Sequence, residues 1–235
     1  DMTEQNRLDE LRAGLERTRA EIQRCAEEAG REAPELLPVT KFHPAEDIAL
    51  LAQLGITDVA ENREQEARAK AEALPDMRFH MIGQIQTKKA NHVARWAHSV
   101  HSLDSEKLAR ALDRGVALAQ EREQREGTLP VFIQVSTDAD TARGGCPLEQ
   151  IPELVAIVEE LENLDLQGFM VVPPLDSDPA EVFTRVKGLV EDVAKQLGRP
   201  LKLSAGMSAD MQAAIESGTD IVRVGTGIMG PRPVV

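Results

Sequence analysis

The sequence predicts an α/β protein that forms a single (β/α)8 TIM barrel preceded by an extra long amino-terminal helix. Short apolar or β-branched segments alternate with amphipathic helical patterns along the chain, which is typical of βαβ units and a parallel sheet. Eight strand segments can be counted, as a closed barrel requires, although a doubly wound open sheet gives the same alternation. No Pro/Gly/Ser-rich linker divides the 235 residues, so we expect one domain over residues 1–235.

The first predicted element is a long helix that ends near Gly30. Its apolar residues recur at alternating steps of three and four, which places them on one face: Leu8, Leu11, Leu15, Thr18, Ile22, Cys25 and Ala29. We expect this face to pack across the main body. A partner helix from a second subunit is the alternative.

The later elements follow in strand–helix order. Strands are expected over residues 36–41, 57–60, 78–82, 99–103, 130–135, 165–172, 201–204 and 220–224. Helices are expected over residues 44–53, 64–73, 87–95, 105–122, 147–160, 179–197 and 208–216. Right-handed connections between the strands then give a parallel sheet with its helices outside.

The charge balance argues against several classes of partner. There are 27 Lys and Arg against 40 Asp and Glu, a net charge of -13, which repels nucleic acids and anionic membrane surfaces. No apolar run reaches membrane-spanning length, and the charged amino end does not resemble a signal peptide. Cys25 and Cys146 form no CxxC motif and are expected to be buried, which favours a cytoplasmic location.

We predict no bound metal. The sequence has no zinc-type or EF-hand spacing. His98 and His101 are three residues apart on a predicted strand, so their side chains are expected on opposite faces.

Lys41 is the first candidate functional residue, because it ends the first predicted strand. Reactive groups in such barrels gather at the carboxyl ends of the strands, where a partly desolvated amine can attack a carbonyl. An ordinary strand-end lysine is equally compatible with this position. The other lysines mostly fall in predicted helices and are interpreted as solvent-facing.

Two glycine- and hydroxyl-rich loops follow the last two strands and predict an anion site. Ser204, Gly206, Met207 and Ser208 belong to the first, where Ser208 is expected to cap a helix. Gly225 and Thr226 belong to the second, and loops after strands seven and eight are the usual phosphate site of this architecture.

Arg223 alternates with two valines in the last strand, so its side chain is expected to point into the barrel. There it needs an acceptor: a carboxylate in an internal salt bridge, or a ligand's phosphate or ring nitrogen. Lys41, the two loops and Arg223 together describe a site for pyridoxal 5'-phosphate (PLP), with an imine to Lys41, the phosphate between the loops and the pyridine nitrogen at Arg223.

Six segments also resemble, in order and spacing, the pyridoxal phosphate homeostasis protein family: 37–41 (LPVTK), 61–66 (ENREQE), 79–89 (FHMIGQIQTKK), 168–170 (GFM), 203–210 (LSAGMSAD) and 222–226 (VRVGT). The resemblance implies a barrel similar to the amino-terminal domain of bacterial alanine racemase. It implies Lys41 as the Schiff-base lysine, Asn62 beside the cofactor, and Arg223 at the pyridine nitrogen. The remaining cofactor-binding positions are Ser204, Gly206, Met207, Ser208, Gly225 and Thr226.

The chain also departs from the family pattern at four positions, namely Pro38, Ala60, Arg143 and Ala205. His80 lies in a matching motif and is either a site residue or a hydrogen-bonded core histidine.

The expected function is to carry PLP within the cell without substrate turnover, as a monomer that supplies PLP-dependent apo-enzymes. Racemases of this fold pair the cofactor lysine with a tyrosine from a second domain, and this sequence has no tyrosine. The main alternative is a PLP-dependent amino-acid racemase or related enzyme. A sugar-phosphate isomerase or aldolase could use the same lysine and loops without PLP. A structural adaptor would need neither loop.

Overall fold

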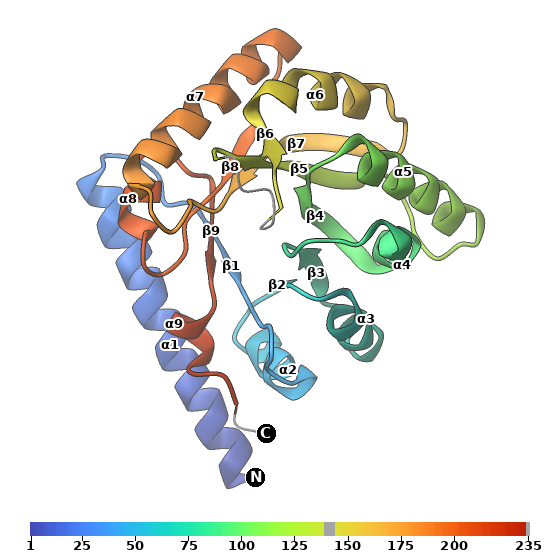
Figure 1. Cartoon of the computed structure of the whole chain (residues 1–235). Helices are drawn as coiled ribbons and strands as arrows, with labels where there is room; N and C mark the ends of the chain where they lie inside the picture. The colour runs from blue at the N-terminus through green and yellow to red at the C-terminus, as the bar shows by residue number, and fades with distance from the viewer. Residues whose placement is uncertain (139–143, 234–235) are drawn as a thin grey trace.

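The computed structural model describes residues 1–138 and 144–233 and forms a barrel of parallel strands surrounded by helices (Figure 1). The barrel strands in this described part are β1 (Glu35–Pro38), β2 (Asp58–Glu61), β3 (Arg78–Met81), β4 (Ala97–Leu103), β5 (Leu129–Ser136), β7 (Leu164–Val171), β8 (Lys202–Ser204) and β9 (Ile221–Val224). A two-residue strand, β6 (Cys146–Pro147), pairs with the end of β5. Arg143, one of the departures from the family pattern, lies outside the described residues.

The strands follow one another around the barrel in the order β1-β9-β8-β7-β5-β4-β3-β2. Every strand pair is parallel. A parallel bridge between Val39 and Ala60 joins the two ends of this series, and the Thr40 N–H donates to the Ala60 carbonyl at 3.0 Å. The prediction of an eight-stranded barrel over an open sheet is therefore confirmed.

The helices lie outside the strands and agree closely with the predicted ranges. They are α1 (Met2–Glu28), α2 (Ala45–Gln53), α3 (Glu64–Ala73), α4 (Ala90–Trp96), α5 (Glu106–Glu121), α6 (Ile151–Glu160), α7 (Pro179–Leu197), α8 (Met211–Glu216) and α9 (Thr226–Met229). Single 3₁₀ turns, η1 (Thr87–Lys89) and η3 (Leu148–Gln150), precede α4 and α6. The sequence did not predict α9 or β6, because segments this short carry no periodicity. Within the described residues, no helix is both long enough and apolar enough to cross a bilayer.

The first strand is shorter than predicted, because β1 ends at Pro38 and Lys41 lies in the turn that follows. Pro38 is nevertheless in register opposite Val224. The next amide, that of Val39, donates to Val224, whereas the Thr40 amide turns toward β2. Successive amides of this segment point alternately toward β9 and β2, so an amide at Pro38 would point toward β2. Pairing with β2 begins only at Val39, so the proline removes no hydrogen bond between strands.

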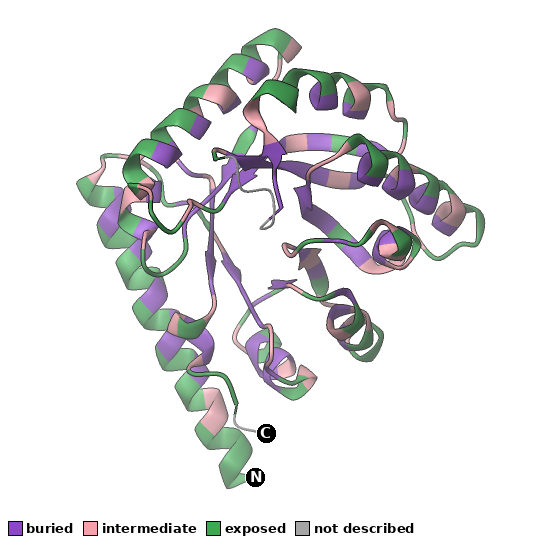
Figure 2. Cartoon of the chain, viewed as in Figure 1, coloured by how far each residue is buried: buried purple, intermediate pink, exposed green. Residues whose placement is uncertain are grey.

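The core lies between the barrel and its helices, where buried residues follow the strands and the inner faces of the helices (Figure 2). Phe79, Phe169 and Phe183 are among its largest fully buried side chains. Both cysteines are buried and free, as predicted. Burial is the main cause that raises the pKa of each thiol, that of Cys146 to about 11.

Helix α1 packs across the body of the barrel, as predicted, against α2, α8 and α9 (Figure 1). Its apolar face contributes Leu11 and Leu15 to a cluster that includes Ile228. The Arg7 guanidinium donates to the Asp47 carboxylate at 3.0 Å and to the Met229 carbonyl at 2.8 Å. These contacts join the amino-terminal helix to the segment that follows the last strand.

The backbones of α1 and α9 approach each other closely at Gly14. A Cβ at this position would lie 2.5 Å from the Ile228 carbonyl oxygen. We expect Gly14→Ala to lower the free energy of unfolding by about 1–3 kcal/mol, because the backbones must separate. The control is Gly188→Ala in α7, where a Cβ would meet nothing within 4 Å; it should be neutral or stabilising by up to about 1 kcal/mol. Urea unfolding measures both, and equal effects would contradict the packing argument.

Candidate functional site

A cavity of about 780 Å³ opens at the carboxyl ends of the strands. It is lined by segments that follow β1, β2, β3, β7, β8 and β9. Seven of the nine predicted site residues lie on its wall, namely Lys41, Asn62, Met207, Ser208, Arg223, Gly225 and Thr226. Residues far apart in the sequence therefore meet at one opening, while their role in binding stays a prediction.

The other two predicted residues, Ser204 and Gly206, are buried behind that wall. The Ser204 hydroxyl accepts from Arg223 Nη1 at 2.8 Å, and the Gly206 carbonyl accepts from the Arg223 N–H at 2.9 Å. Gly206 has a φ of 105°, and a Cβ there would lie 2.7 Å from that of Ala214. Both residues thus support Arg223 and its loop from behind.

Arg223 points into the barrel, as predicted, and is 2% exposed. The side-chain hydrogen bonds of its guanidinium within the described chain go to neutral oxygens, those of Ser204 and of the Val171 carbonyl. Burial lowers its pKa to about 10, although nearby Asp210 acts in the opposite direction. The group therefore stays protonated at neutral pH, and its remaining N–H donors can serve an acceptor in the cavity.

The two glycine- and hydroxyl-rich loops contact each other beside Arg223. A Cβ on Gly227 would lie 3.4 Å from Ser208 Oγ, which places the second loop directly beside the first. Ser208 does not cap α8, contrary to the prediction: the cap is Asp210, whose carboxylate accepts the Met207 N–H at 2.7 Å. The turn formed in this way leaves Ser208 on the wall of the cavity.

Lys41 lies in a tight turn between two residues that are held by hydrogen bonds. On one side, the Thr40 hydroxyl donates a short hydrogen bond to the Glu61 carboxylate. On the other, the Phe42 N–H donates to Glu66 Oε2 at 2.7 Å, and Phe42 has a φ of 72°, which is rare for a bulky side chain. The turn is therefore fixed on both sides while the Lys41 side chain lines the cavity.

Lys70 joins these hydrogen bonds into one buried network, which corrects the prediction that the lysines in helices face solvent. Its Nζ donates to the Thr40 carbonyl at 3.0 Å, to Glu61 Oε2 at 2.9 Å and to Glu66 Oε2 at 2.6 Å. Burial raises the pKa of Glu61, and Lys70 is the main opposing influence. Glu66 and Lys70 are four residues apart on α3, a spacing that could have indicated their pairing.

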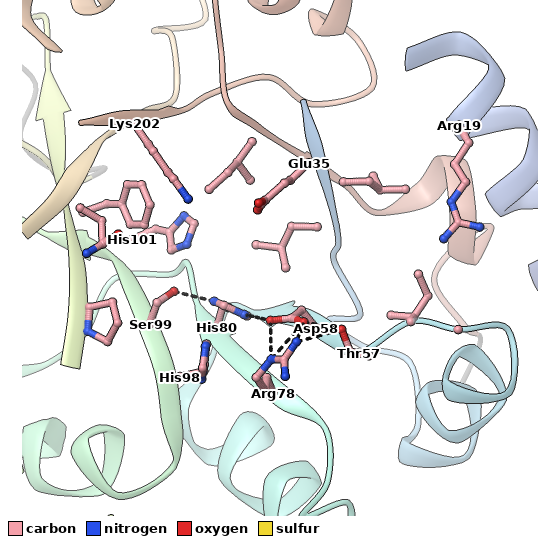
Figure 3. Close-up of a pocket in the computed structure, with 18 residues that line it drawn as sticks. Arg19, Glu35, Thr57, Asp58, Arg78, His80, His98, Ser99, His101 and Lys202 are labelled. Carbon is pink, nitrogen blue, oxygen red and sulfur yellow. Dashed lines mark hydrogen bonds and ion pairs between the residues drawn. The ribbon is translucent and has the colours of Figure 1, made fainter. Parts of the chain in front are cut away.

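A second cavity, of about 610 Å³, lies at the opposite, amino-terminal end of the strands (Figure 3). His80 belongs to it and not to the Lys41 cavity: Nε2 lies 2.7 Å from Asp58 Oδ2, and Nδ1 bonds with Ser99 Oγ. His80 is therefore a hydrogen-bonded histidine, the second of its two interpretations. His101 lies deeper, with Nδ1 2.9 Å from Ser204 Oγ, and strong desolvation lowers its pKa well below the usual value.

Asp58 predicts a pH dependence of stability. Burial alone would raise its pKa, but hydrogen bonds from His80, Arg78 and Thr57 outweigh burial and hold the pKa well below its usual range. The unfolded chain then binds the proton more tightly, so the stabilisation is complete above about pH 4 and is lost as the pH falls. We expect Asp58→Asn to be less stable than wild type at neutral pH and to approach it in acid. Unfolding curves measured against pH test this, and the exposed Asp176→Asn should follow wild type.

Comparison with known proteins first defines the class of this barrel. Residues 14–233 match the family model described as alanine racemase, N-terminal domain. This match agrees with a barrel of parallel strands.

More similar relatives define the family. The chain is 56% identical over 200 residues to the pyridoxal phosphate homeostasis protein of Corynebacterium glutamicum, covering 85% of this chain and 90% of that protein. It is 42% identical to the protein of the same name from Mycobacterium bovis, covering 97% and 95%. PipY of Synechococcus elongatus, solved with PLP bound, is 30% identical, with a TM-score of 0.78 and coverage of 94% and 100%. The chain belongs to the pyridoxal phosphate homeostasis protein family.

Proposed function

We propose that this chain binds PLP in the cavity at the carboxyl ends of the strands, as an imine with Lys41, and holds it for supply without turning over a substrate. The observation that carries the proposal is that Lys41, Arg223 and both hydroxyl-bearing loops line one cavity. The PLP-bound structure of PipY, a protein of similar fold and sequence, supports the choice of ligand.

The residues of the cavity suit the phosphate and the ring of PLP. The Ser208 and Thr226 hydroxyls would donate to the phosphate, and Gly225 lies on the same wall. These local donors must act against the net charge of -13. Asn62 lines the same wall and would offer its amide to the ring.

Lys41 supplies the covalent chemistry. Its neutral amine attacks the aldehyde carbon, a C–N bond forms, and the carbonyl oxygen leaves as water. The network around Thr40 and Phe42 keeps the amine at the cavity by fixing both neighbouring residues.

Arg223 supports the proposal that the chain does not turn over a substrate. A protonated arginine can only donate, so it would keep the pyridine nitrogen unprotonated and weaken the ring as an electron sink. The chain also has no tyrosine to act as a second base. We infer that the protein passes PLP to apo-enzymes in the cytoplasm and acts as a monomer of one domain.

The direct test of the proposal uses the purified wild-type chain loaded with PLP. Borohydride should reduce the imine irreversibly, and peptide mass spectrometry should find the adduct on Lys41. An unmodified Lys41 in PLP-saturated protein would reject the proposal. A protein that shows no imine absorbance but binds a phosphorylated sugar would favour the isomerase or aldolase alternative.

A separate measurement distinguishes a carrier from a racemase. Exchange of the α-hydrogen of D- and L-alanine for deuterium is followed by NMR with PLP-loaded protein. We expect no exchange above that given by free PLP. Steady-state exchange would establish the racemase alternative and would leave the binding site itself intact.

A further inference from the structure

The amino-terminal cavity brings together three side chains that the sequence does not place near one another. Asp58 comes from β2, His80 from β3 and His98 from β4, and a potential ligand atom of each lies within 4.8 Å of the other two. The His80 and His98 rings meet edge to face, with centroids 5.1 Å apart. Figure 3 shows the three side chains on one side of the cavity.

We propose that Asp58, His80 and His98 bind a divalent transition-metal ion of the Zn²⁺ type, with water from the cavity completing its coordination. Two imidazoles and one carboxylate form a donor set that Zn²⁺, Co²⁺ and Ni²⁺ accept. The ligand atoms of a tetrahedral Zn²⁺ site lie roughly 3.4 Å apart, given bonds of about 2.0–2.2 Å. His98 is exposed, so rotation of its side chain can close the remaining gap.

His80 is already oriented for this role. Its Nε2 points to Asp58, and Ser99 holds Nδ1 from the other side. A metal at Nε2 requires the imidazole proton to lie on Nδ1, where the Ser99 hydroxyl can accept it, since a hydroxyl both donates and accepts. Metal binding therefore needs a change of tautomer at His80, in which the Ser99 hydroxyl changes from donor to acceptor toward Nδ1.

The charges around the cluster permit a cation but do not all favour it. Arg78 donates to both oxygens of Asp58, yet its side chain is half exposed and the carboxylate has further lone pairs to offer. The cationic Arg19 and Lys202 also line the cavity and oppose a bound cation, whereas the anionic Glu35 favours one.

His101 is not part of the proposed site. It is fully buried, Nδ1 bonds with Ser204, and its ring lies 6.0 Å from that of His80, centroid to centroid. The proposed metal site thus lies at the opposite end of the barrel from Lys41, which lines the other cavity.

The test is calorimetric titration of tag-free, PLP-loaded protein with Zn²⁺ and with Co²⁺, in a buffer that binds neither ion. We expect one ion per chain and no competition from excess Mg²⁺, which prefers oxygen ligands. His98→Ala should weaken binding by at least about tenfold, because loss of an orienting partner alone costs that much. Long-range ¹H–¹⁵N spectra of the histidine rings should show metal-dependent shifts at His80 and His98 and not at His101.

The control is His92→Ala, which removes a part-buried histidine bonded to Arg68 and Arg95 outside this cluster. It should bind Zn²⁺ as wild type does. Absence of one-to-one binding tighter than about 0.1 mM would overturn the proposal. So would binding that survives in His98→Ala or falls equally in His92→Ala. Imine absorbance, recorded on the same samples, reports on the PLP site separately and should be the same in all three proteins.

Discussion

A Lys41→Ala variant should lose all absorbance of the protein-bound imine and show no borohydride-stable adduct, even in excess PLP. The lysine lines the cavity, and alanine removes the amine that would bond to the aldehyde there. Arg223 and the two loops remain, so weak, non-covalent binding is expected to persist. Absorbance spectra and intact mass after reduction measure the two forms of binding.

The matched control is Lys107→Ala, which removes an exposed lysine of α5. It should form the imine with the same yield as wild type. An adduct that persists in Lys41→Ala, at another lysine, would show that the carbonyl is held elsewhere. Lys41→Arg distinguishes the effect of the positive charge from that of imine formation, since a guanidinium keeps the charge but forms no imine with PLP.

A Lys70→Met variant should be destabilised by about 3–5 kcal/mol, the usual cost of leaving a buried charge without its partner. Glu61 is fully buried, and Lys70 is its cationic partner in an ion pair at 2.9 Å. Denaturant unfolding measures the loss. Imine yield with PLP should fall as well, because Lys70 also holds the Thr40 carbonyl beside Lys41.

Two further variants test this explanation. Lys195→Met changes an exposed lysine of α7 and should leave both stability and imine yield near those of wild type. The double variant Lys70→Met with Glu61→Gln should recover part of the lost stability, because the uncompensated carboxylate is gone. A double variant no more stable than Lys70→Met alone would contradict the argument from buried charge.

The barrel could be predicted because its signal is local. Each strand and each long helix carries its own periodicity, and most boundaries fall within two residues of those expected. The convergence of Lys41, Arg223 and the last two loops also followed from a local rule, since the carboxyl ends of parallel strands share one edge. The start of α8 was misplaced because Ser208 resembles a helix cap, while Asp210 is the cap in the structure.

The two polar clusters were not predicted, because they depend on contacts between different elements of the fold. Glu61 and Lys70 meet across the β2–α3 turn, where the sequence alone indicates a helical lysine facing solvent. His80 and Asp58 meet only because β2 and β3 pair in a register that sets their side chains near one another. The prediction that His98 and His101 lie on opposite faces was wrong: both line the amino-terminal cavity and both rings contact His80. The register between β3 and β4 shifts at His98, which breaks the simple alternation along the strand.

The burial of both thiols makes the native chain a convenient background for site-directed labelling. Cys25 and Cys146 are at most 1% exposed, and their raised pKa values keep them in the unreactive thiol form. A cysteine introduced at the exposed position of Lys107 would then react alone with a maleimide dye. Energy transfer between such a dye and bound PLP would let the release of PLP be followed in real time.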